Sequence, residues 1–380
     1  MMDPLEHLRL IRQRARGGDP RKGNLKRVRS LLCTDPGFDR AVWRQMCEKG
    51  WLGMLVAPHA GGSGLGLRAF CDLAEELGGD LVPEPLIQAA VVAPLLPAEM
   101  LAAVLSGDRI VLPAWQESPD SLSLSGSVEY REGRLDGRKV LVPMAAGADA
   151  FLVTVPGGLA LVEHGAPGLN VVLEPTQDGG NIGTLMFDRT PAAPVAGDAT
   201  ETLEQMILAN GAYLLGMMDR ALAITQGYLK TRELFDQTTG IFEAVRDRAA
   251  DMDVQVSLTR SLVKNVIEAM EVETRQPARQ AAVSRARLRC CDAALTVTRT
   301  CVQLHVGAPY ADTTDMDLFL RKAMAMAPLY GSPSAHRARI DAAAAEAARA
   351  SGDAAGATRD RASAPGDGSG ASGDGASAPV

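Results

Sequence analysis

The chain has 380 residues, of which 46% are hydrophobic and only 4% aromatic, and its formal net charge is −7. This length and composition predict a mainly helical protein whose two or three subdomains share a large core. The acidic balance is atypical of a general nucleic-acid binder, which needs a concentrated basic surface.

The sequence contains no signal for a membrane span, secretion or a metal site. No stretch of about eighteen consecutive apolar residues occurs, so we expect no membrane-spanning helix. The N-terminus carries Asp3 and Glu6 where a secretory signal has basic and then apolar residues. The six cysteines form no C-x-x-C pair and no zinc-ligand pattern with the five histidines. We therefore expect a reducing, cytoplasmic location and no bound metal.

Residues 1–110 are predicted to form an N-terminal helical domain. A glycine-rich loop, GGSGLG at 61–66, interrupts its helices. A dinucleotide-binding fingerprint needs such glycines between a strand and a helix of a βαβ unit. Nothing downstream predicts a parallel sheet, so we interpret this loop as a helix connection.

Residues 111–197 are predicted to form a central β domain. Short runs of β-branched residues are separated by turns that contain Gly, Pro and Asp, as is typical of antiparallel strands. The clearest runs are VLV at 140–142, FLVTV at 151–155 and VVL at 171–173.

Residues 198–340 are predicted to form a C-terminal helical domain, because apolar residues return to helical spacing. One stripe of a long helix contains Ile207, Gly211, Leu214, Met218, Leu222 and Leu229, and two more helices are expected over 242–272 and 282–306. Residues 341–380 are rich in Ala, Gly, Ser, Asp and Pro. This composition predicts a disordered tail, although residues 341–349 are compatible with a helical extension.

Three segments carry motifs of one enzyme family. Residues 228–252 place Tyr228, Arg232, Phe235 and an ADM triplet at the spacing of the pattern Y…R-x-x-F…A-D-M. The run CVQLHVGAPY at 301–310 matches Q-l-h-G-G-x-G-y, and GWLGMLVAPHAGGSGLGL at 50–67 matches a loop of the N-terminal domain. Together they closely resemble the acyl-CoA dehydrogenase family over residues 30–340.

The resemblance implies a fold, a cofactor and a set of partners. The implied fold is mainly α with a central β subdomain: an N-terminal helical domain, a small β-barrel or sandwich domain, and a C-terminal four-helix bundle. FAD is the implied cofactor, an acyl-CoA thioester the substrate, and an electron-transfer flavoprotein the usual electron acceptor of a homo- or hetero-oligomer. In the family, residues at the places of Arg232, Phe235, Gln303 and Gly307 reach across the dimer to the FAD of the neighbouring subunit.

The residues that match the family's own active site depart from its pattern. Its catalytic glutamate occupies one of two positions, and these hold Tyr330 and Met206 here. The ordinary pKa of tyrosine is too high for a base. Glu204 is the remaining candidate, although it lies about 200° around the helix from Met206. The family's flavin-packing Trp-x-Thr is replaced by Leu141 and Pro143, and its flavin-side T-E-P loop is reduced to QESP at 116–119.

Two functional hypotheses follow from this mixture of kept and lost motifs. The first is an FAD-dependent acyl-CoA dehydrogenase that carries out α,β-dehydrogenation, with Glu204 as the catalytic base. The alternative is a non-catalytic subunit that completes the FAD site of a catalytic acyl-CoA dehydrogenase in a heteromer. A cofactor-free scaffold is a third interpretation.

Overall fold

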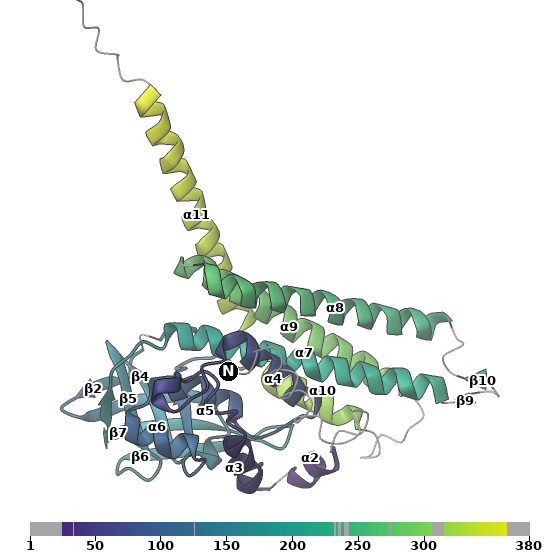
Figure 1. Ribbon diagram of the computed structural model, residues 1–380, viewed down its shortest axis with the longest axis horizontal. Coiled ribbons are helices and arrows are strands. Elements are labelled where there is room, and N and C mark those ends of the chain that lie inside the picture. The colour runs from purple at the N-terminus through teal and green to yellow at the C-terminus, as the bar shows by residue number, and fades with distance from the viewer. Residues whose placement is uncertain are drawn as a thin grey trace, which may run out of the picture.

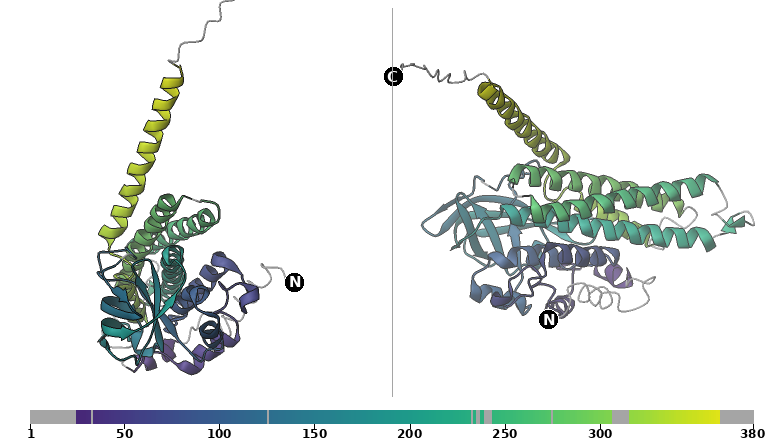
Figure 2. Two further views of the ribbon diagram at one scale, coloured as in Figure 1. Left: turned by 90° about the vertical axis from the view of Figure 1, so that its left-hand side faces the viewer. Right: turned by 45° about the horizontal axis from the view of Figure 1, so that its top comes forward.

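The fold of this chain combines small helices, two four-stranded sheets, one two-stranded sheet and a bundle of long helices. The computed structural model describes residues 25–32, 34–124, 126–231, 233–234, 237–238, 243–273, 275–305 and 315–362. The four-stranded sheets lie at one end of the long helices, and α11 projects away from the body (Figure 1 and Figure 2).

The N-terminal region consists of short helices packed beside the sheets. Asp39 caps the helix that follows it, since its carboxylate accepts a hydrogen bond from the backbone N–H of Ala41 at 2.7 Å. The helices are α2 (Leu25–Leu31), α3 (Arg40–Glu48), η1 (Pro58–Ala60), α4 (Gly66–Gly79), α5 (Leu86–Val92), η2 (Ala93–Leu95) and α6 (Ala98–Leu105).

The central β region contains two four-stranded sheets that remain separate. One sheet has the order β1-β4-β5-β8, and the other has the order β2-β3-β7-β6. Only the β1–β4 pair within these two sheets is parallel. The sheets do not close into a barrel, so of the two forms expected for this domain the closed barrel is not observed. The strands are β1 (Val111–Ala114), β2 (Glu129–Arg131), β3 (Arg134–Pro143), β4 (Ala150–Val155), β5 (Gly158–Glu163), β6 (Leu169–Pro175), β7 (Asn181–Pro191) and β8 (Ala193–Val195), with η3 (Ala145–Gly147) before β4.

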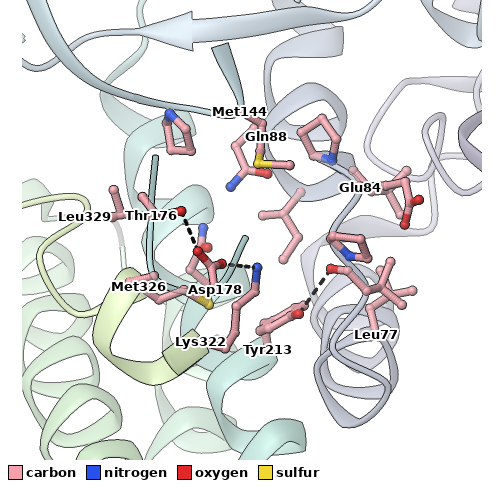
Figure 3. Close-up of a pocket in the computed structure, with 18 of the residues that line it drawn as sticks. Leu77, Glu84, Gln88, Met144, Thr176, Asp178, Tyr213, Lys322, Met326 and Leu329 are labelled. Atoms are coloured by element: carbon pink, nitrogen blue, oxygen red, sulfur yellow. Dashed lines mark hydrogen bonds and ion pairs between the residues drawn. The ribbon is translucent and has the colours of Figure 1, made fainter. Parts of the chain in front are cut away.

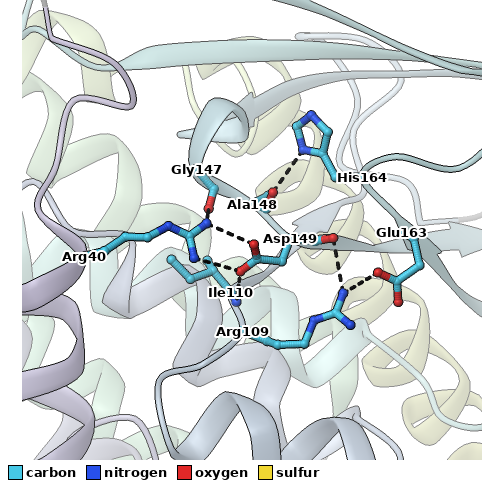
Figure 4. Close-up of polar contacts among 8 residues, drawn as sticks. All are labelled: Arg40, Arg109, Ile110, Gly147, Ala148, Asp149, Glu163 and His164. Atoms are coloured by element: carbon cyan, nitrogen blue, oxygen red, sulfur yellow. Dashed lines mark hydrogen bonds and ion pairs between the residues drawn. The ribbon is translucent and has the colours of Figure 1, made fainter.

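A carboxylate joins the N-terminal helices to the β region (Figure 4). Asp149 accepts hydrogen bonds from both terminal nitrogens of Arg40, at 3.0 and 3.1 Å, and from the backbone N–H of Ile110 at 2.8 Å. Arg109 donates to the backbone oxygen of Asp149 at 3.3 Å and also pairs with Glu163. A bidentate arginine–carboxylate contact fixes orientation as well as distance, so this cluster sets how α3 lies on the first sheet.

The C-terminal region is built around the long helix α7 (Thr200–Thr231), whose predicted apolar stripe is buried. Its glycines permit close packing against α4, because a β-carbon at Gly216 would lie 1.7 Å from the backbone oxygen of Glu75. The remaining elements are β9 (Glu233–Leu234), β10 (Gln237–Thr238), α8 (Glu243–Val272), α9 (Gln276–Leu304), α10 (Met316–Met326) and α11 (Pro333–Ala362). The fold predicted from the sequence, helical, then β, then helical, is thus confirmed.

Two expectations about helices need comment. Helix α11 continues to Ala362, beyond the helical extension over 341–349 that the sequence allows, and frequent alanine favours helix in this stretch; residues 363–380 lie outside the described part. Among the described residues, α7 alone is long and apolar enough to cross a membrane, but 78% of its most apolar window is buried within the protein. Helix α7 therefore has the burial of a core helix.

Candidate functional site

A small pocket lies where all three regions meet (Figure 3). Its volume is about 70 Å³. An engineered cavity of about 150 Å³ binds benzene, so this pocket is smaller than one known to hold a six-carbon ring. The walls come from residues 82–88, the end of β3, the β6–β7 turn, α7 and α10. Most of the lining is apolar, and the charged groups are Glu84, Asp178 and Lys322.

An ion pair closes one side of the pocket. Lys322 Nζ on α10 donates to Asp178 Oδ2 in the β6–β7 turn at 2.8 Å, and Thr176 Oγ1 donates to the other oxygen at 2.5 Å. Burial raises the pKa of Asp178, but Lys322 and the hydrogen bonds outweigh it and leave this pKa below its ordinary value. Burial lowers the pKa of Lys322, and Asp178 more than compensates. Both groups therefore stay charged at neutral pH, and neither is free to accept a proton.

Glu84 and Tyr213 in the pocket wall also make polar contacts. Glu84 pairs with Arg27 and accepts the backbone N–H of Asp39 at 3.2 Å. The hydroxyl of Tyr213 donates to the backbone oxygen of Val82 at 3.1 Å, and burial raises the pKa of Tyr213. These contacts hold the walls of the pocket together, while Glu84 Oε2 and Asn210 Oδ1 are buried without a hydrogen-bond partner among the described residues.

Tyr330 occupies the turn between α10 and α11, beside this pocket. Its side chain is buried, and its hydroxyl accepts a hydrogen bond from Gln88 Nε2 at 3.1 Å. The backbone has φ +58°, the left-handed region that tyrosine rarely adopts. Burial raises the pKa of Tyr330 to about 12, against the opposing effects of Gln88 and Arg287. The phenol is therefore protonated at neutral pH and cannot serve as a base.

Two buried side chains hold the turn that carries Tyr330. Arg287 Nη2 donates to the backbone oxygens of Met326 at 2.6 Å and Leu329 at 2.8 Å, at the carboxyl end of α10. His336 Nε2 lies 3.0 Å from the backbone oxygen of Tyr330. Burial lowers the pKa of His336 to about 4, so the ring is neutral and Nε2 must carry the proton that this carbonyl accepts.

The turn after α10 contacts the β region directly. The backbone N–H of Tyr330 donates to Gln116 Oε1 at 3.0 Å, and that of Ser332 donates to the backbone oxygen of Pro119 at 3.0 Å. Between them, a β-carbon at Gly331 would lie 2.7 Å from Leu122. Residues 116–122 and 330–332 are therefore in van der Waals and hydrogen-bonded contact.

The sequence-predicted base, Glu204, points to a different part of the molecule. It is 1% exposed on α7, and its nearest charged partner is Arg279 of α9, with 3.4 Å between Nε and Oε2. Neither carboxylate oxygen has a hydrogen-bond donor at normal geometry among the described residues. Burial raises its pKa, against the opposing charges of Arg279 and Arg339. Glu204 does not line the pocket of Figure 3, and Met206 is an apolar core residue.

A wider groove of about 520 Å³ lies next to Glu204. Its lining includes Gln280 and Arg339, together with residues 122–124 and 154–159. Glu204 is beneath this surface and does not line it. The carboxyl is thus buried between helices and is not displayed in either cavity.

The segments predicted to contact a neighbouring cofactor converge at the other end of the bundle. The ring of Tyr228, at the end of α7, stacks on His305 after α9 with 4.3 Å between ring centroids. Cys301 Sγ of α9 lies 3.7 Å from Met252 Sδ of α8. Gln303 is exposed there. Arg232, Phe235 and Gly307 lie outside the described residues.

Sequence reasoning missed several residues of the junction. Gln88, Asp178 and Arg287 belong to no motif. Gln116 lies in the reduced loop at 116–119, but only the three-dimensional structure reveals its contact with Tyr330. Lys322 lies in the LFLRKA segment at 318–323, which resembles the family's last helix, but nothing in that resemblance indicates a pairing with the β6–β7 turn.

Comparison with known proteins gives a consistent result. The family model "Acyl-CoA dehydrogenase, N-terminal domain" matches residues 25–96, and "Acyl-CoA dehydrogenase, C-terminal domain" matches residues 197–345. The chain is 27% identical over 338 residues to "Acyl-CoA dehydrogenase IpdE2" of Mycobacterium tuberculosis, covering 87% of this chain and 95% of that one. It is 29% identical over 303 residues to "Acyl-CoA dehydrogenase FadE27" of the same organism, covering 73% and 81%.

Solved structures show the same fold. A variant of the "Tcur3481-Tcur3483 steroid ACAD" superposes with a TM-score of 0.82 at 28% identity, covering 91% of this chain and 100% of that one. A chain of the "ChsE4-ChsE5 complex from Mycobacterium tuberculosis" gives a TM-score of 0.78 at 23% identity, covering 91% and 98%. At that identity the second likeness establishes the fold alone.

Proposed function

Because this chain belongs to the acyl-CoA dehydrogenase family, we propose that it acts in FAD-dependent dehydrogenation of an acyl-CoA as a non-catalytic subunit. In this role it completes the FAD site of a catalytic partner chain. Electron-transfer flavoprotein is the acceptor that the family leads us to expect, and the cytoplasm is the expected location.

The observation that carries this proposal is the side chain at the base position. Removal of the α-proton of an acyl thioester needs a base whose pKa lies near the working pH. Tyr330 stands at that position, with a pKa raised by burial to about 12. The second base position holds Met206, which is fully buried and apolar. Neither residue can accept the proton.

The size of the pocket supports the same conclusion. Its volume of about 70 Å³ is about half that of an engineered cavity that binds benzene, and the ammonium in its lining, Lys322, is already paired with Asp178. A long or bulky acyl group does not fit there without rearrangement of the surrounding helices. This pocket at the base position therefore does not supply an acyl site, and we assign substrate binding to the partner chain.

The end of the bundle farthest from the four-stranded sheets, where α7 and α9 finish, supports the proposed contact with the partner's FAD. The ends of α7 and α9 are held together by the Tyr228–His305 stack, and Gln303 is exposed beside it. Arg232 and Phe235 follow Tyr228 closely in sequence, so a partner that docks on this end meets the residues expected to bind its FAD. The paired name of the similar Tcur3481-Tcur3483 steroid ACAD agrees with a two-chain assembly.

Purified proteins test this proposal directly. The chain alone is expected to show no acyl-CoA dehydrogenation, whereas its mixture with a related chain that has glutamate at the place of Tyr330 is expected to be active. Activity of the isolated chain would contradict the proposal. A mixture no more active than the related chain alone would also contradict it.

Glu204 supports the second candidate function, an autonomous dehydrogenase, because burial raises the pKa of this carboxyl as a general base requires. Glu204→Gln should then abolish turnover by the isolated chain and leave its flavin content unchanged. Glu201→Gln is the matched control, since Glu201 lies one turn away, contacts the same Arg279 at 3.4 Å and has a side chain that is 64% exposed. Under the non-catalytic proposal, neither substitution lowers the turnover of the two-chain mixture.

A further inference from the structure

We propose that this chain folds as a flavin-free subunit, because contacts within the chain fill the place of its own flavin. From this and the proposed function, it follows that a complex with a catalytic partner carries one flavin for each pair of chains. The first statement concerns this chain alone, and only the stoichiometry rests on the proposed function.

The resemblance places the loop at 116–119 beside the flavin and Tyr330 at the base position beside the acyl group, and these two segments touch each other here. A flavin and an acyl group between these segments would need van der Waals separations of about 3.5 Å at each contact. Instead, Gln116 Oε1 lies 3.0 Å from the backbone nitrogen of Tyr330, and the backbone oxygen of Pro119 lies 3.0 Å from the backbone nitrogen of Ser332.

An apolar side chain closes the remaining space. Leu122 is buried against Gly331, so tightly that a single added β-carbon at Gly331 would lie 2.7 Å from it. The glycine has φ +101°, which suits a residue without a side chain. Between Leu122 and Gly331 there is therefore no space for a ring.

The strand that would support the flavin also has an unsuitable shape. The pairing of β3 with β7 shifts register between Lys139 and Val142, which marks a β-bulge. Leu141 lies within the bulge at φ +56°. Pro143, at the place of the family's threonine, has neither a hydroxyl nor a backbone N–H to donate.

Buried polar networks hold both flanking surfaces in place. On the β side, Lys139 Nζ is fully buried and donates to Glu117 Oε1 at 2.7 Å and to Thr154 Oγ1 at 2.9 Å. On the helical side, Arg287 and His336 fix the carbonyl groups of the α10–α11 turn. Insertion of a flavin would have to separate two surfaces that are each anchored in the core.

The isolated chain tests the first statement without any enzyme assay. Thermal unfolding is followed with and without excess FAD, with a flavin-binding relative as the positive control. We expect the purified chain to be colourless, with an unchanged melting temperature, whereas the control melts several degrees higher. A flavin absorbance band that co-purifies with the isolated chain, or an upward shift with FAD, would overturn the inference.

The stoichiometry is measured on the two-chain complex by flavin absorbance and protein mass. One flavin for each pair of chains is expected. Two flavins per pair would refute the flavin-free assignment and leave the proposed partnership intact. If no complex forms, the proposed function fails, and the unfolding measurement on the isolated chain still decides whether its own flavin place is closed.

Discussion

Replacement of Glu117 by glutamine should destabilise the fold strongly, because this carboxylate neutralises a fully buried ammonium. Lys139 is 0% exposed, and its Nζ lies 2.7 Å from Glu117 Oε1. The other acceptors of the ammonium are uncharged: Thr154 Oγ1 at 2.9 Å and the backbone oxygen of Trp115 at 3.4 Å. The second oxygen of Glu117 accepts the backbone N–H and the hydroxyl of Ser127, at 2.6 and 2.9 Å.

The structure gives the size and the pH dependence of this effect. Breaking a buried ion pair by removing one partner costs about 3–5 kcal/mol. Burial raises the pKa of Glu117, but Lys139 and Ser127 bring it down to about 2, from an ordinary 4.5. Since the side chain is 20% exposed, we reduce the estimate and expect a loss of about 2–3 kcal/mol. A lowered carboxyl pKa stabilises the fold above pH 4.5, and this contribution is lost as the pH falls from 4.5 toward 2.

Urea unfolding at pH 7, repeated at decreasing pH, measures both features. Glu129→Gln is the matched control, since Glu129 lies on the neighbouring strand β2 in an exposed pair with Arg131. We expect little change from the control. Addition of Lys139→Met to the Glu117 variant should recover part of the loss, because no unpaired charge then remains buried. Equal stability of the Glu117 and Glu129 variants would refute the reasoning.

Four further substitutions test the packing and the site. Gly216→Ala should lower the free energy of unfolding by about 3 kcal/mol, because its β-carbon would lie 1.7 Å from the backbone oxygen of Glu75. Gly227→Ala lies in open space on the same helix and should raise the free energy of unfolding by about 0.5–1 kcal/mol. Equal urea midpoints for the two variants would contradict this expectation. Tyr330→Phe removes the hydrogen bond from Gln88 and should lower the free energy of unfolding, measured in urea, by about 1 kcal/mol. The turnover of the two-chain complex should be unchanged. A loss of turnover would assign the hydroxyl a catalytic role. Burial raises the pKa of Glu204, so the wild-type protein should lose stability relative to the Glu204→Gln variant as the pH rises above 4.5. Urea unfolding at pH 4 and pH 8 measures this. If the two proteins differ in free energy of unfolding by the same amount at both pH values, the pKa of the carboxyl is not shifted.

The order of elements could be predicted because it depends on local patterns. The stripe from Ile207 to Leu229 has the period of a helix and is buried as expected. The run FLVTV at 151–155 lies in the fully buried strand β4. Helix α9 begins at Gln276, earlier than the predicted 282, because the polar residues before Ala281 give no apolar periodicity. Helix ends of this kind are set by capping and tertiary contacts more than by pattern.

The glycine-rich loop at 61–66 shows how packing explains a motif-like sequence. A β-carbon at Gly62 would lie 2.1 Å from the backbone oxygen of Val56. The glycine is thus required for a close approach of the chain to itself. This agrees with the interpretation of the segment as a helix connection.

The junction around Tyr330 could be predicted only in part. Counting along the family pattern placed Tyr330 at the base position, but nothing in the sequence pairs it with Gln116, 214 residues earlier. Similarly, Lys322 and Asp178 are separated by 144 residues, and neither belongs to a motif that suggests the other. Such contacts arise from the way the three regions pack together, which residue periodicity does not encode.

The most direct test of the proposed partnership is the flavin content of a complex in which this chain carries Arg232→Ala. Arg232 is the residue that the family motif assigns to the FAD of the neighbouring subunit, and the catalytic chain is left unchanged. If this chain completes the partner's cofactor site, the complex should still assemble but should lose most of its bound flavin. A complex that assembles with its flavin content and turnover unchanged would contradict that role.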